Sequence, residues 1–90
     1  MEHELKIWPQ YFQAVYDGRK TFEVRVNDRG FQAGDSVILH EWDNLRFVEN
    51  SNNFTGYTGR KIQFEIGYVY PLDDGRVVFS LINRRSDWNG

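Results

Sequence analysis

Apolar and polar residues alternate along five stretches of the chain, and this period of two predicts five β-strands. The expected strands span residues 3–8, 21–26, 36–42, 58–70 and 77–82. Apolar residues occupy both faces of the third stretch, which is typical of a strand inside a sheet. Gly67 interrupts the longest stretch, so we expect a bulge or bend there of the kind that curves a sheet into a barrel.

One helix is expected between the first two strands. Pro9 suits the first turn of a helix, and Gly18 suits a left-handed C-cap. The aromatic and apolar residues between them fall at helical spacing along one stripe: Tyr11, Phe12, Val15 and Tyr16. A helix of about two to three turns needs packing to be stable, so we expect it to plug an end of the sheet.

The segments between these elements are polar. We expect a structured loop at 27–35, a turn containing Asp-Gly at 71–75, and a polar C-terminal tail at 83–90 that frays. Residues 43–56 form a long connection, which we interpret as a variable insert. Because 90 residues make one domain, residues 1–82 are predicted to fold as a single unit.

The order of strand, helix and four strands predicts a mainly β protein of the α+β class. The expected fold is a small five-stranded β-barrel with one short helix after the first strand. Aromatic residues make up 17% of the chain, and they supply the large apolar area that so small a core needs. Closure into a barrel would also remove exposed sheet edges.

Composition narrows the classes of partner. The chain has no cysteine, which excludes disulfides, thiolate metal sites and cysteine nucleophiles. No apolar run approaches the roughly 20 residues needed to span a bilayer, and the N-terminus lacks the pattern of a signal peptide. We therefore expect a cytoplasmic protein without a membrane partner. The formal net charge of −2 argues against a broad contact with duplex DNA.

Residues 18–29 concentrate positive charge, with four basic residues against two acidic ones, or a net +2. Thr21, Glu23 and Arg25 share one face of an extended strand. The other face carries three apolar residues: Phe22, Val24 and Val26. We expect the apolar face to enter the core and the charged face to point outward.

The charged strand also has a recognisable spacing, G-x-K-x-x-E-x-R, at Gly18, Lys20, Glu23 and Arg25. Further motif residues follow in order over about two thirds of the chain: His3, Leu5, Lys6, Pro9, Phe12, Asn27, Asp28, Arg29, Phe31, Gly34, Asp35, Glu41, Tyr57, Thr58, Gly59 and Arg60. The series resembles the ASCH domains, small relatives of the PUA fold that are linked to RNA or nucleotide binding. It is most similar to a subgroup of short, single-domain bacterial and phage proteins of unknown function, DUF3850-like. The resemblance implies a PUA-like barrel.

The resemblance also implies a ligand cleft between the charged strand, the helix and the end of the first strand. The residues expected to bind RNA or a nucleotide there are Lys6, Trp8, Lys20, Glu23, Arg25 and Arg29. The cations would meet a phosphate, Glu23 would accept hydrogen bonds from a base, and Trp8 would stack on one, ahead of Trp42 and Tyr68. The alternative is a purely structural role, in which Glu23 and Arg25 form a salt bridge that only orders the strand.

A second hypothesis is catalysis. Some ASCH-related proteins are small amidohydrolases of acylated cytidines, which use a lysine, a threonine and a distant glutamate. Lys20 matches the lysine, but Glu23 stands where the family has its threonine, and Thr21 is the nearest hydroxyl. Glu41 or Glu65 would be the distant carboxylate. We favour binding over catalysis.

A third hypothesis is a protein-interaction module that uses the insert as its contact surface, through Leu45, Phe47 and Phe54. A metal site is not expected, because His3 and His40 lack ligand spacing and the carboxylates are scattered. No cofactor is expected either.

Overall fold

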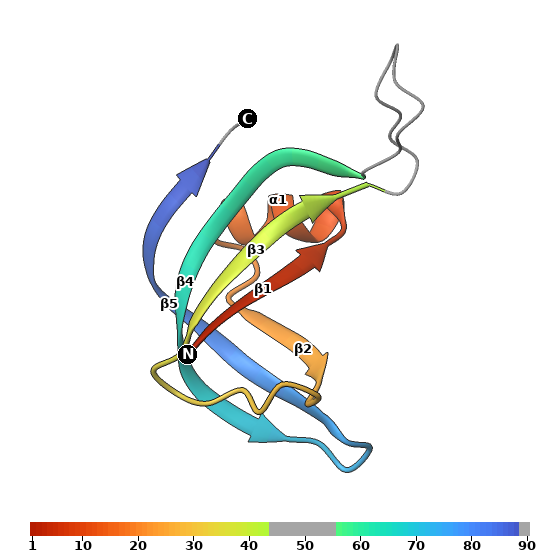
Figure 1. The fold of residues 1–90 in the computed structure, drawn as a ribbon, viewed down its shortest axis with the longest axis vertical. Helices are drawn as coiled ribbons and strands as arrows, with labels where there is room; N and C mark the ends of the chain where they lie inside the picture. Colours follow the sequence, from red (N-terminus) through yellow and green to blue (C-terminus); the bar gives the residue numbers. More distant parts are fainter. Residues whose placement is uncertain (44–55, 89–90) are drawn as a thin grey trace.

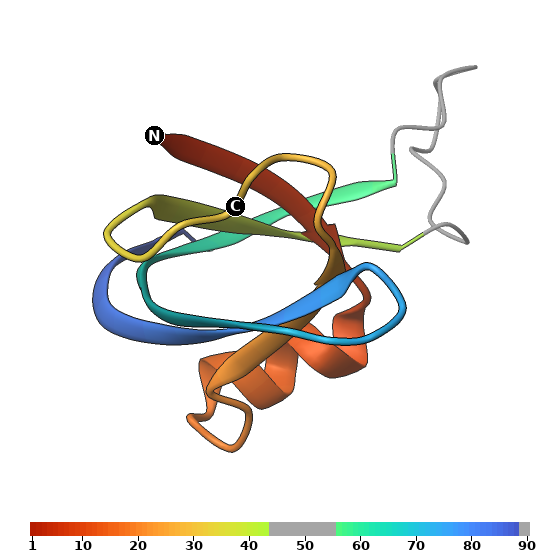
Figure 2. The same cartoon turned by 90° about the horizontal axis from the view of Figure 1, so that it is seen from below.

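The computed structural model describes the backbone of residues 1–43 and 56–88 and, within these ranges, the side chains up to residue 85. Its elements are β1 (Glu2–Ile7), α1 (Pro9–Tyr16), β2 (Phe22–Val26), β3 (Ser36–Trp42), β4 (Tyr57–Pro71) and β5 (Arg76–Trp88). The strands form one curled sheet, and the helix packs against its inner side (Figures 1 and 2). The expected mainly β architecture with a single helix after the first strand is confirmed.

The sheet has the strand order β1-β3-β4-β5-β2, which makes it a half-barrel with β1 and β2 as its outer strands. The pair β1–β3 is parallel, and the other three pairs are antiparallel. A parallel pair needs a long crossover between its strands. Here the crossover from β1 to β3 contains α1, β2 and the loop 27–35. One strand of the crossover, β2, forms the edge of the sheet opposite β1.

The core lies on the inner side of the curl. Alternating residues of the strands point into it, and the helix contributes Phe12 and Val15, both fully or almost fully buried. Phe31 anchors the loop 27–35, as expected, with its ring centroid 4.9 Å from that of Phe79. The helix therefore serves mainly to cover the inner side of the sheet.

The structure reverses the expected faces of β2. Glu23 is buried, with 4% of its surface exposed, whereas Phe22, Val24 and Val26 are exposed by 44%, 37% and 62%. The cause is the pairing with β5, in which Glu23 lies opposite Phe79. Directly opposite residues of an antiparallel pair share a face, so the inward direction of Phe79 takes Glu23 inward as well.

The last strand is longer than the sequence predicts. β5 continues past Ile82 to Trp88, where a frayed tail was expected. Its end pairs with β4, with Lys61 opposite Trp88, and a register shift and the positive φ of Asn83 adjust the ladder on the way. Main-chain hydrogen bonds form whatever the side chains are. This part of β5 is polar and lacks the alternating apolar pattern by which a strand is predicted from sequence.

The bulge expected at Gly67 is present, since the pairing of β4 with β5 shifts between Ile66 and Val69. A Cβ atom at Gly67 would lie 2.7 Å from Oγ of Ser80, so the close approach of the two strands favours glycine here.

The insert lies mostly outside the described residues. Only its ends are described, where the amide of Asp43 donates a hydrogen bond of 2.7 Å to the carbonyl of Gly56. The contact surface predicted at Leu45, Phe47 and Phe54 falls outside them. In the described ranges, no helix is long and apolar enough to cross a membrane.

A polar latch fixes the start of β1. The ring of His3 is 3% exposed, and its Nε2 lies 2.8 Å from Oδ2 of Asp35. The N-terminal amine and the amide of Gln32 also bond to the Asp35 carboxylate. The hydrogen bond with His3, followed by those with the amine and the amide, holds the pKa of Asp35 below its usual value of 3.8, although partial burial opposes the shift.

We expect Asp35→Asn to lower the free energy of unfolding by about 1–3 kcal/mol at neutral pH, because His3 loses a charged partner. The folded state has the lower pKa, so this stabilisation is complete above the usual pKa of 3.8 and is lost as the pH falls through the folded-state value. Urea unfolding between about pH 7 and pH 2 should show the difference from wild type shrinking at the acid end. Asp73→Asn, in an exposed turn, is the control, and a difference for Asp35→Asn that persists unchanged in acid would contradict the assignment.

Candidate functional site

The two outer strands, β1 and β2, are bridged by arginine side chains, and we call this junction the seam. Nη2 of Arg25, on β2, donates a hydrogen bond of 2.7 Å to the carbonyl of Lys6 on β1. Nη1 of Arg29, in the following loop, donates one of 2.8 Å to the carbonyl of Glu4. Side chains thus satisfy carbonyl groups of an edge strand where a closed barrel would use a neighbouring strand.

Glu23 is the buried centre of the seam. Nε of Arg25 donates a hydrogen bond of 3.0 Å to Oε2, and Nζ of Lys20 donates to Oε1. Lys20 also donates to the carbonyl of Phe22 at 2.8 Å. A buried carboxylate is stable only when it is paired and hydrogen-bonded, and here each of its oxygens faces a cation.

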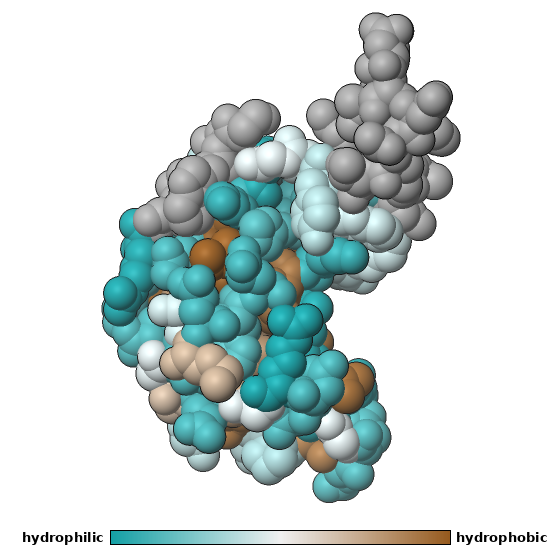
Figure 3. Space-filling view, in the orientation of Figure 1, coloured by the Kyte–Doolittle hydropathy of each residue, from teal (hydrophilic) through white to brown (hydrophobic). Residues whose placement is uncertain are grey.

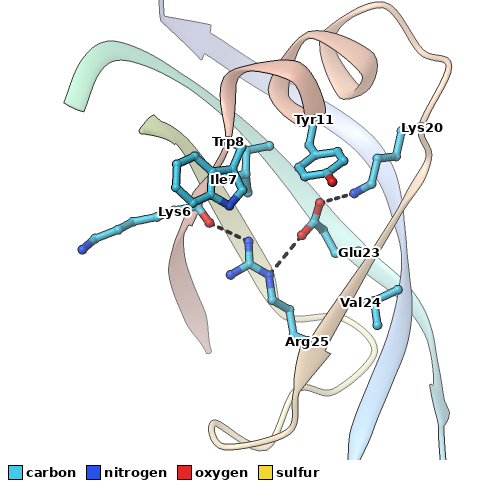
Figure 4. A pocket seen from close by; sticks show the side chains of 8 residues that line it. All are labelled: Lys6, Ile7, Trp8, Tyr11, Lys20, Glu23, Val24 and Arg25. Carbon is cyan, nitrogen blue, oxygen red and sulfur yellow. Dashed lines mark hydrogen bonds and ion pairs between the residues drawn. The ribbon is translucent and has the colours of Figure 1, made fainter. Parts of the chain in front are cut away.

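A hollow of about 400 Å³ opens beside this cluster, between the start of α1 and β2, and we call it the first hollow. It is lined by Lys6, Ile7, Trp8, Tyr11, Lys20, Glu23, Val24 and Arg25 (Figure 4). Trp8 is the residue between β1 and α1, and Tyr11 lies in the first turn of the helix. Their side chains are 43% and 48% exposed. The edge of Trp8 packs on Trp42, with ring centroids 5.5 Å apart. The first hollow therefore combines two accessible aromatic side chains with an anchored arginine.

A second hollow, of about 660 Å³, shares Lys6 and Arg25 with the first. It is lined by Glu4, Leu5, Lys6, Arg25, Arg29, His40 and Tyr57. Nε2 of His40 is 2.8 Å from Oε1 of Glu4, and the rings of His40 and Tyr57 meet edge to face at 5.8 Å. In the space-filling view the molecule is notched on the right, between the upper end of β1 and β2 (Figure 3).

The structure brings the predicted ligand residues together. Lys6, Trp8, Lys20, Glu23 and Arg25 line the first hollow, and Arg29 lines the second. The side chain of Lys6 points away from the first hollow (Figure 4), and its Nζ lies 5.1 Å from the ring centre of Trp42 and 5.8 Å from that of Tyr57.

The two other stacking candidates, Trp42 and Tyr68, lie outside both hollows. Trp42 contacts Trp8 and lines neither hollow, and Tyr68 is 69% exposed and also lines neither. Tyr11 is not predicted as a site residue, because it fits the apolar stripe of the helix. His40 and Tyr57 are not predicted as site residues either, because no local motif connects them with β1.

The seam is positive on an otherwise acidic chain. Its four cations are Lys6, Lys20, Arg25 and Arg29, and its two carboxylates are Glu4 and Glu23, so the formal sum is 4 minus 2, or +2. A charge of this size and extent suits a small anionic ligand and not a long polyanion.

The residues considered for hydrolysis have other tasks in this arrangement. The ammonium of Lys20 is paired with Glu23, and Thr21 is not among the residues that line either hollow. Glu41 is 7% exposed and accepts a hydrogen bond of 2.7 Å from the hydroxyl of Thr58. Glu65 pairs with Arg85 at 3.2 Å. No serine, threonine or cysteine lines the first hollow within the described ranges.

Metal ligation has no support in the described part of the chain, which contains no group of three or more histidine, aspartate or glutamate side chains able to hold an ion. The buried Glu41 instead lies 3.8 Å from Nη1 of Arg60, whose guanidinium stacks 4.8 Å from the ring centre of Phe12. This second buried carboxylate ties β3 and β4 to the helix.

We expect Arg25→Gln to lower the free energy of unfolding by about 1–3 kcal/mol, because the buried Glu23 loses one of its two cations. Arg19→Gln is the matched control. Its exposed pair with Asp17 should contribute little to stability. Urea unfolding measures both.

Combining Arg25→Gln with Glu23→Gln should cost less than the sum of the single changes, because the two side chains form one network. Strict additivity would show that the contact between Glu23 and Arg25 does not contribute to stability.

Comparison with known proteins now gives the family. A family model described as a domain of unknown function, DUF3850, matches residues 2–81. A relative from Escherichia phage P2, described as an uncharacterized 12.9 kDa protein in the GpA 3′ region, is 37% identical over 82 residues. The alignment covers 91% of this chain and 66% of the relative, so the chain spans just under two thirds of that protein's length. The predicted similarity to the DUF3850 group is confirmed, and the chain belongs to the DUF3850 family.

Proposed function

We propose that the protein binds a nucleotide, or one nucleotide of a single-stranded RNA, in the first hollow. The relationship to the ASCH domains and the PUA-like fold, suggested by the spacing of Gly18, Lys20, Glu23 and Arg25, belongs to this proposal. So does a cytoplasmic location, where such ligands are abundant.

The observation that carries the proposal is the position of two half-exposed aromatic rings beside a fixed guanidinium. Trp8 and Tyr11 flank the hollow, and Arg25 is held at its floor by Glu23 and by the carbonyl of Lys6 (Figure 4). A base has an apolar face that stacks on such rings, and its phosphate requires a cation a short distance away. A guanidinium has five N–H donors, and these two contacts use two of them.

Binding is favoured over the hydrolase hypothesis by this geometry. That hypothesis uses a threonine, and the lining of the first hollow offers no aliphatic hydroxyl or thiol within the described residues. The hypothesis of a protein partner at the insert concerns residues beyond the described ranges, and this geometry does not bear on it.

The test is a titration of the ¹⁵N-labelled protein with the four ribonucleoside monophosphates and with N4-acetylcytidine, at low and moderate salt. We expect chemical-shift changes centred on Trp8, Tyr11 and Arg25. Trp8→Leu should weaken binding by at least about five-fold, because stacking contributes about 1–3 kcal/mol per base. Tyr68→Leu, a change of an exposed aromatic residue outside both hollows, should leave the affinity unchanged.

Three outcomes would count against the proposal. Equal losses with Trp8→Leu and Tyr68→Leu would mean that stacking in the first hollow does not hold the ligand. Conversion of N4-acetylcytidine to cytidine would favour the hydrolase hypothesis. The absence of shifts with every compound would favour the hypothesis of a protein partner that binds at the insert.

A further inference from the structure

We propose that the two hollows are consecutive subsites for a short single-stranded oligonucleotide, with the phosphodiester between two nucleotides held at Arg25 and Lys6. This inference rests on the proposed function and extends it from one nucleotide to a strand that crosses the seam. It assigns a ligand to the second hollow, and it makes Tyr57 a residue that stacks on the second base.

The two hollows are neighbours. Lys6 and Arg25 line both, so the two spaces adjoin at these residues. Arg25 faces a third hollow as well, together with Arg29 and Arg76, which shows that it lies in the middle of the seam. A strand that occupies both hollows would therefore cross the contact between Arg25 and the carbonyl of Lys6.

Aromatic side chains are distributed over both hollows. The first hollow has Trp8 and Tyr11. The second has Tyr57, which is 45% exposed and stands edge to face with His40. A mononucleotide has one base and leaves one of these platforms empty, whereas a dinucleotide supplies one base to each.

The positions of the cations also fit a dinucleotide. Arg25 lies at the boundary between the hollows, and the ammonium of Lys6 extends toward Tyr57, 5.8 Å from its ring centre. Arg29 adds a guanidinium to the second hollow. Positive charge between two stacking platforms matches the order base, phosphate, base along a single strand.

The carboxylates and the overall charge limit the length of the strand. Glu4 borders the second hollow, and the chain carries a formal charge of −2, so there is little attraction beyond the seam itself. We therefore expect two nucleotides, or three, to capture nearly all of the affinity.

The experiment compares uridine monophosphate, pU, with the dinucleotide pUpU and the trinucleotide pUpUpU, and repeats the comparison with the adenosine series. We expect pUpU to bind at least about ten-fold more tightly than pU, because it adds one stacked base and one phosphate. The shift changes should spread from Trp8 and Tyr11 to His40 and Arg29 when pUpU replaces pU.

The decisive quantity is the ratio of the pU and pUpU dissociation constants in variants. Tyr57→Leu should lower this ratio at least about five-fold, because it removes the stacking of the second base. Tyr70→Leu, a matched change of an exposed tyrosine that lines neither hollow, should preserve the wild-type ratio. Chemical shifts of core amides establish that each variant is folded.

The outcomes separate this inference from the function on which it rests. Binding of pU without any gain for pUpU would overturn the second subsite and leave the proposed function intact. A gain for pUpU that Tyr57→Leu leaves undiminished, without shifts at His40 or Arg29, would place the second nucleotide elsewhere and also overturn the inference. The absence of binding in both series would refute the proposed function together with the inference.

Discussion

The fold depends on the pairing of one buried carboxylate. Glu23 lies on the inner side of the sheet, where an isolated negative charge would be strongly destabilising. Lys20, two residues before β2, and Arg25, on β2, both pair with it, and Arg25 also donates to the carbonyl of Lys6. The pairing with β5 turns this face of β2 inward, and the charge cluster stabilises the buried carboxylate there and ties β2 to β1.

The barrel is incompletely closed between β1 and β2. The backbone ladder runs through five strands but does not join its two ends, and side chains of Arg25 and Arg29 take over at the seam. A ladder would fill the space between two strands with main-chain hydrogen bonds. Arginine side chains bridge a wider gap and leave hollows on either side, so the same contacts that complete the fold also create the candidate binding surface.

Preorganisation follows from these contacts. Arg25 and Lys20 already have fixed partners, so a ligand would not have to order them, and the entropic cost of binding is reduced accordingly. The pairing with Glu23 also reduces the net charge of the seam, which limits long-range attraction. Recognition by such a site has to come from stacking and short-range hydrogen bonds, and this suits a small ligand or a short strand.

The sequence by itself determined the number of strands, the single helix, the bulge at Gly67 and the family, because these depend on local periodicity, on backbone freedom and on a spaced motif. It also named Lys6, Trp8, Lys20, Glu23, Arg25 and Arg29 as one group, through the resemblance. It did not determine the inward face of β2 or the extension of β5, since cross-strand register sets both. Nor could it find Tyr11, His40 and Tyr57 at the hollows. Only the tertiary structure decided these points, because the contacts join residues far apart in the chain through pairing and curvature, which leave no local pattern.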